Sequence, residues 1–582
     1  METNPWTIIR KYQFPLLLVG IGILIYANSL FGQPIWDDTG YVFDNADFTH
    51  VSLVKIFTDN IYVLNGYYRP LVAFYYSVML FFFGHQTFFF HAFQLMVHIT
   101  NAFFLMLVFK KFLPRMVSFF SALVFLVHPL TVEAVAYIAA FDDVGSFFFG
   151  ITGLYVLLYK QISKKMYGVM YLLFLSALLI KESAIVFLIL SIVYVALYHR
   201  QRIKHISILM ASVLGSYFLI RLGFVGIAHH ASPLTPIASM PFFERMLSLP
   251  MIFFYYLSNV FFPWKLAIDQ QWIVLSPNFL NFYFPLSFLI GFLALLIAPL
   301  WWLARKKQIL DAYIFFLCWF AMGIGMHLQI FPLDMTVADR WFYIPLAGLL
   351  GLMGVFVYRF IRLTRIAYIS VGIIICLLSF RTMFRNTNWT DRLTLYLHDA
   401  KNTNSFELDA NTAAELIDAK HFDEALFYAR RSVSTLPLDY NTYDLGALYE
   451  ITNKPALAKE YYYKALSAKS HPIAGHRHIL ELYQGVGEFS ALNDSPENAI
   501  NILRQGINDY PNDAIVWMYL GVAAYKGDDQ KLAESASKKA YDLSQTANTT
   551  YVKNQIFQHL PLVVTTKLGA SQTILTPGNS TN

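Results

Sequence analysis

The sequence predicts an all-α membrane protein in two parts, a polytopic domain of about eleven transmembrane helices followed by a solenoid of helical repeats. Of the 582 residues, 57% are hydrophobic and 14% are charged, whereas soluble proteins carry about 25% charged residues. Apolar runs long enough to cross a bilayer follow one another as far as residue 381. From Trp389 onward the composition is that of a soluble protein and small residues recur periodically.

The membrane part contains eleven apolar runs that we predict to span. Such a helix needs about 20 mostly apolar residues. The first run follows Arg10 and Lys11 and has no small-residue cleavage site after it, so we expect a retained helix rather than a removed signal peptide. Two further stretches, 71–84 and 247–263, are interrupted or flanked by polar residues, and we expect both to lie at the interface. The predicted spans are 14–32, 87–109, 116–132, 135–159, 167–180, 183–199, 206–224, 283–303, 312–330, 342–358 and 366–381.

Basic residues predict the orientation, because Lys and Arg collect in cytoplasmic connections. Every second connection is basic, which accounts for the net charge of +6 without a nucleic-acid partner. The N-terminus is therefore predicted to be cytoplasmic, and an odd number of spans places the C-terminal part outside the cytoplasm. The basic groups are Arg10 and Lys11; Lys110, Lys111 and Arg115; Lys160, Lys164 and Lys165; Arg200, Arg202 and Lys204; Arg305, Lys306 and Lys307; and Arg359, Arg362 and Arg365. Arg381 and Arg385, at the outer end of the last span, run against this pattern.

A repeat of small residues organises the C-terminal part. Ala425, Ala458, Ala499 and Ala533 are separated by 33, 41 and 34 residues. A 34-residue period is typical of tetratricopeptide repeats, in which paired helices stack into a solenoid with a concave surface. We therefore predict a transmembrane domain at 1–388, a tetratricopeptide-repeat domain at 389–563 and a disordered polar tail at 564–582.

Paired carboxylates follow the first predicted span. Asp37 and Asp38 sit where a side chain can meet both a lipid headgroup and a water-soluble acceptor, and a carboxylate there can act as a general base. The alternative is a solvated acidic loop. Glu133 and Asp143 lie inside apolar runs, where an ionisable group is costly and a functional role is the default hypothesis. The alternative for these is that Glu133 caps a helix after Pro129 and that Asp143 pairs with a nearby base.

Three basic residues in otherwise apolar surroundings are candidates for binding a phosphate group. They are Arg69, Lys181 and Arg340. The guanidinium fork of arginine matches phosphate oxygens, and a lysine supplies a point charge. The bland alternatives are that Lys181 lies in a turn at the outer surface, and that Arg340 pairs with its neighbour Asp339.

Other kinds of site are absent from the sequence. The chain contains no Walker loop, no GxGxxG after a strand and no zinc-binding spacing. The two cysteines lie in apolar runs and build no disulfide framework. His91 and His98 are two helical turns apart, too far to share a metal alone, and we expect them to form hydrogen bonds between helices. Dependence on a divalent metal stays open.

Several stretches, in this order, resemble the transmembrane and tetratricopeptide-repeat-containing O-mannosyltransferases and their prokaryotic relatives in the C-type glycosyltransferase superfamily. The resemblance covers nearly the whole chain. It departs from the family at Thr131, where a second histidine is common, and at Phe141, where an arginine is common. The stretches are Trp36-Asp37-Asp38, Tyr68-Arg69-Pro70-Leu71, His91 to Asn101, His128-Pro129 with Glu133-Ala134-Val135, Lys181-Glu182, Phe262 to Leu266, Arg340 to Pro345 and Trp389 ahead of the repeats.

This resemblance implies a C-type glycosyltransferase fold and an activity. A hexose such as mannose would move from a polyprenyl or dolichyl phosphate to a Ser or Thr hydroxyl of a polypeptide held by the repeats, outside the cytoplasm and with inversion. Asp37 or Asp38 would be the base, and Arg69, Lys181 and Arg340 would bind the lipid phosphate. The membrane would be the plasma membrane of a prokaryote or the endoplasmic reticulum of a eukaryote. The rival hypotheses are a flippase for lipid-linked sugars and a membrane-anchored repeat scaffold.

Overall fold

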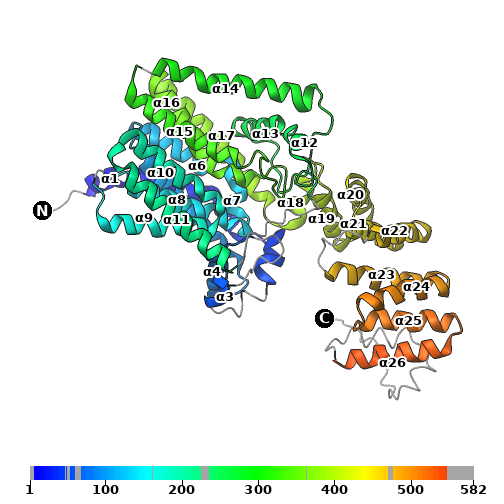
Figure 1. The fold of residues 1–582 in the computed structure, drawn as a ribbon. Helices are drawn as coiled ribbons and strands as arrows, with labels where there is room; N and C mark the ends of the chain where they lie inside the picture. Colours follow the sequence, from blue (N-terminus) through cyan, green and yellow to red (C-terminus); the bar gives the residue numbers. More distant parts are fainter. Residues whose placement is uncertain are drawn as a thin grey trace. The chain divides into compact units, whose positions relative to one another are not determined.

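The computed structural model describes residues 5–45, 48, 53–58, 67–159, 161–224, 235–303, 305–361, 364–468 and 476–546 (Figure 1). These residues form helices joined by turns and loops, with no strand among them, so the all-α prediction is confirmed. The chain divides into two compact units, Met1–Leu408 and Asp409–Asn582. The predicted tail at 564–582 lies outside the described residues.

The first unit is a bundle of long apolar helices. Its longer helices are α1 (Pro5–Tyr26), α4 (Pro70–Phe83), α5 (Thr87–Phe109), α6 (Arg115–Val127), α8 (Phe141–Leu157), α9 (Lys164–Ile180), α10 (Ile185–Tyr198), α11 (Ile203–Phe224), α13 (Leu249–Phe261), α14 (Phe284–Leu303), α15 (Lys307–Gly325), α16 (Tyr343–Phe360), α17 (Arg365–Asn388) and α18 (Arg392–Asp399). Short pieces between them are η1 (Ala27–Phe31), η2 (Asp38–Phe43), α3 (Leu53–Thr58), η3 (Pro129–Thr131), α7 (Val132–Ala136), η4 (Ile138–Ala140), η5 (Glu182–Ala184), η6 (Arg200–Arg202), α12 (Phe242–Met246), η7 (Phe279–Tyr283) and η8 (Asp339–Phe342).

Eight helices in the described part of the chain are long and apolar enough to cross a membrane. The bent pair Arg115–Val127 and Pro129–Ala136 makes a ninth span if it is counted as one. The two remaining predicted spans, 167–180 and 183–199, correspond to α9 and to the shorter apolar helix Glu182–Tyr198. The stretches expected at the interface, 71–84 and 247–263, form α4 and α13, of 14 and 13 residues.

Glycines let neighbouring helices approach closely. A Cβ on Gly348 of α16 would lie 2.5 Å from the backbone nitrogen of Phe320 in α15, and one on Gly351 would lie 2.2 Å from the Phe316 ring. On α8, a Cβ on Gly150 would similarly meet the ring of Phe187 in α10 at 2.2 Å. Small residues at such crossings are typical of membrane bundles, where packing rather than hydrophobic burial holds helices together.

Polar side chains also join the helices, as predicted for His98. Its Nδ1 accepts a hydrogen bond from the Tyr343 hydroxyl at 2.7 Å, and its Nε2 donates to the Leu126 carbonyl at 3.0 Å. Asn101, one turn along α5, donates to the same hydroxyl at 3.0 Å and to the Val144 carbonyl at 2.9 Å. The core of the bundle is therefore tied together by α5.

The predicted span 116–132 is broken rather than continuous, whereas the predicted span 135–159 is present as the candidate span Ile138–Leu157. Helix α6 ends at Val127 and the chain bends by 55° into the short helices η3 and α7. Pro129 cannot donate a backbone hydrogen bond, and the His128 side chain accepts instead from the Leu130 amide. A second break at Tyr137 precedes η4 and α8. These breaks place Glu133 in the short buried helix α7.

The two arginines that run against the charge pattern have local partners in the structure. Arg381 of α17 donates to the Pro263 carbonyl at 3.0 Å. Arg385 donates to both oxygens of Asp399 in α18, at 2.5 and 2.9 Å, and the Ile268 amide donates to the same carboxylate at 2.8 Å. Arginine and aspartate are both buried. Helix α18 is thereby fastened to the first unit, which extends to Leu408.

The second unit consists of paired helices that pack on their neighbours along the chain. They are α20 (Phe422–Thr435), α21 (Asp439–Ile451), α22 (Pro455–Ala468), α23 (His476–Asn493), α24 (Pro496–Asp509), α25 (Ala514–Lys526) and α26 (Gln530–Thr546), preceded by α19 (Phe406–Asp418), which begins in the first unit. The recurring alanines are buried between helices. This arrangement agrees with the predicted tetratricopeptide-repeat solenoid.

Candidate functional site

A cavity of about 780 Å³ in the first unit brings together four of the seven predicted site residues. Asp37 comes from the segment after η1, Arg69 from the start of α4, Lys181 from the junction of α9 and η5, and Arg340 from η8. Asp38, Glu133 and Asp143 do not line the cavity; each is buried directly behind a residue that does. Residues far apart in the sequence therefore converge on one space.

The cavity has a charged end and an apolar end. Asp37, Asp142 and the three predicted cations line the charged end. The apolar lining includes Ile185 and Ile189 of α10, Met322 of α15 and, beyond its end, Met326 and Ile330. Ile189 and Ile330 are 40% and 45% exposed, so this end reaches the outer surface of the helix bundle.

Asp37 is half-buried at the cavity wall, and its surroundings raise its pKa. The backbone amide of Asp37 donates to the Tyr137 hydroxyl at 3.2 Å. Burial raises the pKa of the Asp37 carboxyl to about 6, against the opposing effects of the Tyr137 hydrogen bond and the Arg340 charge. A carboxylate with a pKa near neutrality is suited to accepting a proton.

Asp38 is turned the other way, into the protein. One of its carboxylate oxygens accepts a hydrogen bond from the Ile35 amide at 3.0 Å, and the other accepts from the Ala139 amide at 2.7 Å. Only 1% of the residue is exposed. Asp38 therefore fastens the segment that carries Asp37 to η4, the short helix before α8. The two adjacent carboxylates face different surroundings.

The charged end of the cavity is an alternating chain of ion pairs. Lys181 lies 2.6 Å from Asp143 and 3.3 Å from Asp142, and Asp142 also pairs with Arg69. Arg69 continues the chain to Glu182 at 3.3 Å, and Glu182 pairs with Arg221 of α11 at 3.1 Å. Asp143 thus pairs with a nearby base, as its alternative interpretation expects. Lys181 is 7% exposed and lies in this network, so the expectation of a surface turn is wrong.

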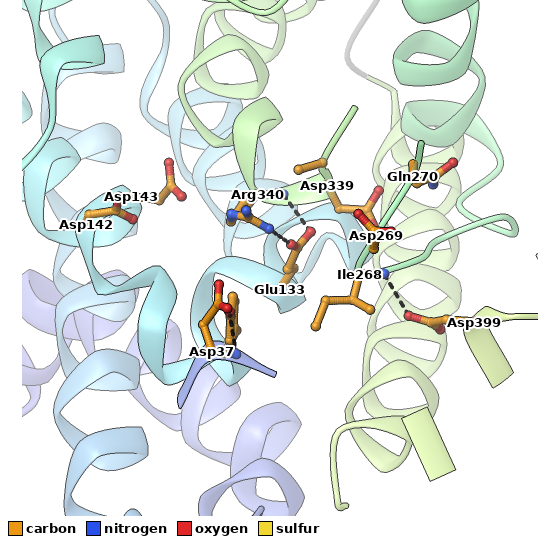
Figure 2. Close-up of polar contacts among 12 residues, drawn as sticks. Asp37, Glu133, Asp142, Asp143, Ile268, Asp269, Gln270, Asp339, Arg340 and Asp399 are labelled. Carbon is orange, nitrogen blue, oxygen red and sulfur yellow. Dashed lines mark hydrogen bonds and ion pairs between the residues drawn. The ribbon is translucent and has the colours of Figure 1, made fainter. Parts of the chain in front are cut away.

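Arg340 and Asp339 point in opposite directions, as Figure 2 shows, so the expectation that they pair with each other is wrong. The Arg340 guanidinium pairs with Glu133, which also accepts a hydrogen bond from the Arg340 amide at 3.0 Å. Asp339 instead accepts a hydrogen bond from the Tyr255 hydroxyl of α13 at 2.6 Å. Glu133 is 2% exposed, so it holds Arg340 from behind while the guanidinium borders the cavity.

Four lining residues escaped the sequence-based prediction of the site. Arg221 sits in the last turn of an apolar helix, where it is indistinguishable from an ordinary flanking charge. Tyr137, Asp334 and His327 also line the cavity. Tyr137 lies four residues after Glu133, and this spacing is the one signal that could have indicated it. His327 and Asp334 lie in the segment between α15 and η8, whose sequence carries no recognisable motif.

Among the residues that the structure describes, no group of three or more His, Cys, Asp or Glu side chains is placed to hold a metal ion. The candidate site is therefore built from ion pairs, a carboxylate at the cavity wall and an apolar extension.

Two curated proteins that are similar to this chain are named protein O-mannosyl-transferases. Human protein O-mannosyl-transferase TMTC3 is 25% identical over 248 residues, which are 40% of this chain and 27% of that protein. Human protein O-mannosyl-transferase TMTC1 is 32% identical over 139 residues, 22% of this chain and 16% of that protein. The matched part thus spans about a quarter or less of these relatives, and no protein-family model matches the chain. The resemblance predicted from the order of the motifs is confirmed: the chain is similar in sequence to protein O-mannosyl-transferases.

Proposed function

We propose that the chain is an integral membrane glycosyltransferase that moves a hexose from a lipid-phosphate donor to a Ser or Thr hydroxyl of a polypeptide. Mannose is the sugar to expect from the names of the relatives. The observation that carries the proposal is the convergence of Asp37, Arg69, Lys181 and Arg340 on one cavity. A membrane-anchored scaffold has no need for such a convergence.

The donor class follows from the two ends of the cavity. Its apolar end, between α10 and the end of α15, suits a polyprenyl or dolichyl chain that enters from the surrounding lipid. Its charged end suits the phosphate, since guanidinium and ammonium groups bind phosphate oxygens by charge and hydrogen bonding. The sugar would then lie between the phosphate and Asp37.

The reaction is a displacement at the anomeric carbon with inversion. Asp37 takes the proton of the acceptor hydroxyl as its oxygen bonds to the anomeric carbon, and the bond from that carbon to the phosphate oxygen breaks. The lipid phosphate leaves with one additional negative charge. Arg69, Lys181 and Arg340 stabilise this charge as it develops, and the loss of one such contact costs on the order of 2–4 kcal/mol.

The cations are already paired with carboxylates, which bears on how a phosphate binds. Arg69, Lys181 and Arg340 each have an acidic partner, so the site carries little net charge before the donor arrives. A phosphate oxygen that approaches Arg69 or Lys181 competes with Asp142 for their hydrogens. We expect the ion pairs to keep the cations in place, and the acidic partners to limit how tightly the leaving phosphate is held.

The test replaces Asp37 and Asp38 singly with Asn and measures transfer from a mannosyl phosphoryl polyprenol to a Ser/Thr peptide. D37N should lose at least two decades in kcat, because general-base catalysis contributes about 10²–10⁴-fold. D38N should act mainly through stability, because Asp38 bonds to backbone amides. Full activity of D37N would remove the general-base role. If lipid-linked sugar moved across the vesicle membrane and the acceptor peptide stayed unmodified, the chain would be a flippase instead.

A further inference from the structure

The segment that carries Asp37 is held by residues from the far end of the first unit. The Gln33 amide donates to the Thr390 carbonyl at 2.9 Å. Arg392, at the start of α18, donates to the Pro34 carbonyl at 3.2 Å and to the Thr39 hydroxyl at 2.9 Å. The stretch between α17 and the end of α18 thus contacts the Asp37 segment on both sides of the carboxylate.

Trp36, the residue before Asp37, has a backbone conformation that a tryptophan rarely adopts. Its φ is 54°, in the left-handed region that bulky side chains disfavour and that persists only where surrounding structure enforces it. Its amide donates to the Tyr396 hydroxyl of α18 at 3.2 Å, and the two rings meet edge to face with centroids 5.6 Å apart. Tyr396 is 3% exposed, so its position is fixed by packing.

The conformation of Trp36 decides where Asp37 points. The Trp36 amide binds α18 and the next amide, that of Asp37, binds the Tyr137 hydroxyl at 3.2 Å. Consecutive amides are therefore held by two tyrosines that are far apart in the sequence. If the first of these contacts is lost, the residue at 36 is free to relax to a negative φ, and the carboxylate that follows turns with it.

We propose that Tyr396 is a positioning residue that keeps Asp37 directed into the cavity by holding the strained backbone of Trp36. The inference rests on the proposed role of Asp37 as general base. It adds a residue more than 350 positions away in the sequence, located in the short helix that precedes the repeat unit. Tyr396 does not touch the substrate; it acts through the backbone.

The first test is Tyr396→Phe, which keeps the ring and removes the hydroxyl that accepts from Trp36. We expect kcat to fall about 2- to 10-fold, the factor that corresponds to one hydrogen bond of ordinary net strength, with KM for the donor little changed. The acid limb of the pH–rate profile should move to lower pH, because burial is the main cause of the raised pKa of Asp37 and a loosened segment is better hydrated. Amide hydrogen exchange of residues 33–39 should accelerate.

The matched control is Tyr171→Phe, which removes a hydrogen bond to Ser216 between α9 and α11 and does not touch the Asp37 segment. It should leave kcat, the acid limb and exchange at 33–39 unchanged. The inference would be overturned if Y396F and the unsubstituted chain had the same kcat, the same acid limb of the pH–rate profile and the same amide hydrogen exchange at 33–39.

A second variant separates positioning through Trp36 from a general loss of structure. Glycine adopts a φ of 54° without strain, so in a W36G background the additional change Y396F should alter kcat by less than twofold. The same fold-loss in both backgrounds would overturn the inference. Should D37N prove fully active, the proposed general-base role of Asp37 fails, whereas hydrogen exchange at 33–39 still reports whether Tyr396 holds the segment.

Discussion

At the scale of single residues, the structure separates two carboxylates that the sequence presents as equivalent. Asp37 and Asp38 are adjacent and follow the same apolar run. One lines the cavity beside Arg340, and the other accepts hydrogen bonds from the Ile35 and Ala139 amides. Only the cavity-facing carboxylate has an open approach for a hydroxyl group, so the two residues should respond differently to substitution and to pH.

The pH dependence of transfer should report the raised pKa of Asp37. A base works in its ionised form, so activity should be lost as the pH falls through about 6, the pKa to which burial raises this carboxyl. An aspartate with an ordinary pKa would instead lose activity near pH 4. The measurement is kcat against pH from 4.5 to 8 with a saturating donor. Activity that stays at its plateau down to pH 5 would contradict the assignment of Asp37.

Glu133, the partner of Arg340, should matter more for stability than Glu182 in the ion-pair chain. Its side chain is 1% exposed, so Glu133→Gln would leave the Arg340 guanidinium without its charge partner. Removal of one member of a buried pair costs about 3–5 kcal/mol, and the cavity beside Arg340 places this case at the lower end. Thermal unfolding in detergent would measure the loss. Glu182→Gln is the control, because Glu182 is 33% exposed and its pairs are screened by water, so its loss should be smaller.

Part of the site could be predicted from the sequence because ionisable residues in apolar surroundings are rare. Arg69, Lys181 and Arg340 stand out for that reason, and all three line the cavity. The sequence could not separate Asp37 from Asp38, since the difference depends on an amide about one hundred residues away. Arg221 was missed because a charge in the last turn of a span is common at membrane surfaces.

At the scale of elements, helix crossings explain where the bundle is least tolerant of change. Helix α16 presents Gly348 and Gly351 to α15, and the nearest atoms to a Cβ on Gly348 belong to the Phe320 and Trp319 backbones. Side chains can rotate away from an added methyl group, but backbone atoms can move only if a helix shifts. Arg340 lies in η8, the turn directly before α16. The crossing of α15 and α16 therefore also positions the site.

Gly348→Ala should therefore destabilise the first unit. Overpacking of this kind costs typically about 1–3 kcal/mol, and here the contact of 2.5 Å is with backbone. The matched control is Gly372→Ala in α17, where no atom lies within 4 Å of an added Cβ. Alanine is the better helix former, so the control should be neutral or slightly stabilising. Equal thermal midpoints for both variants would contradict a tight α15–α16 crossing.

The prediction of elements succeeded where apolar length alone decides and failed where the backbone breaks. Helices α5, α14 and α17 follow from runs of apolar residues. The chain from His128 to Ala140 is equally apolar, yet it forms three short helices because Pro129 removes a backbone donor and buried side chains take over hydrogen bonds. Hydropathy does not register such breaks, although His128-Pro129 marks the first of them.

At the scale of the whole molecule, the orientation in the membrane is a proposal that follows from charge. Connections rich in Lys and Arg alternate with connections that hold few, which places the N-terminus and the 110–115 turn in the cytoplasm and the Asp37 segment outside it. The two partners found for Arg381 and Arg385 remove the main discrepancy, since both arginines are engaged within the protein rather than facing a membrane surface.

This topology predicts the labelling of single introduced cysteines. In a chain whose Cys318 and Cys376 are replaced by Ala, a cysteine at Lys111 should be protected from an impermeant thiol reagent in intact cells. A cysteine at Lys454 in the repeat unit should be labelled. Permeabilised cells supply the control, because both positions are expected to react there. Labelling at Lys111 and protection at Lys454 in intact cells would invert the proposed orientation.

The ion pair between Arg385 and Asp399 has a consequence for how such chains can diversify. Because α18 and the residues up to Leu408 belong to the first unit, a recombination event that joined a new array of repeats directly after the last span would discard Asp399, Arg392 and Tyr396 together. The membrane portion would then lose Asp399, the carboxylate partner of Arg385, together with the residues that hold the Asp37 segment. Exchange of whole repeat arrays is compatible with the structure only at a junction beyond Leu408, because the contacts of Asp399, Arg392 and Tyr396 would then be kept.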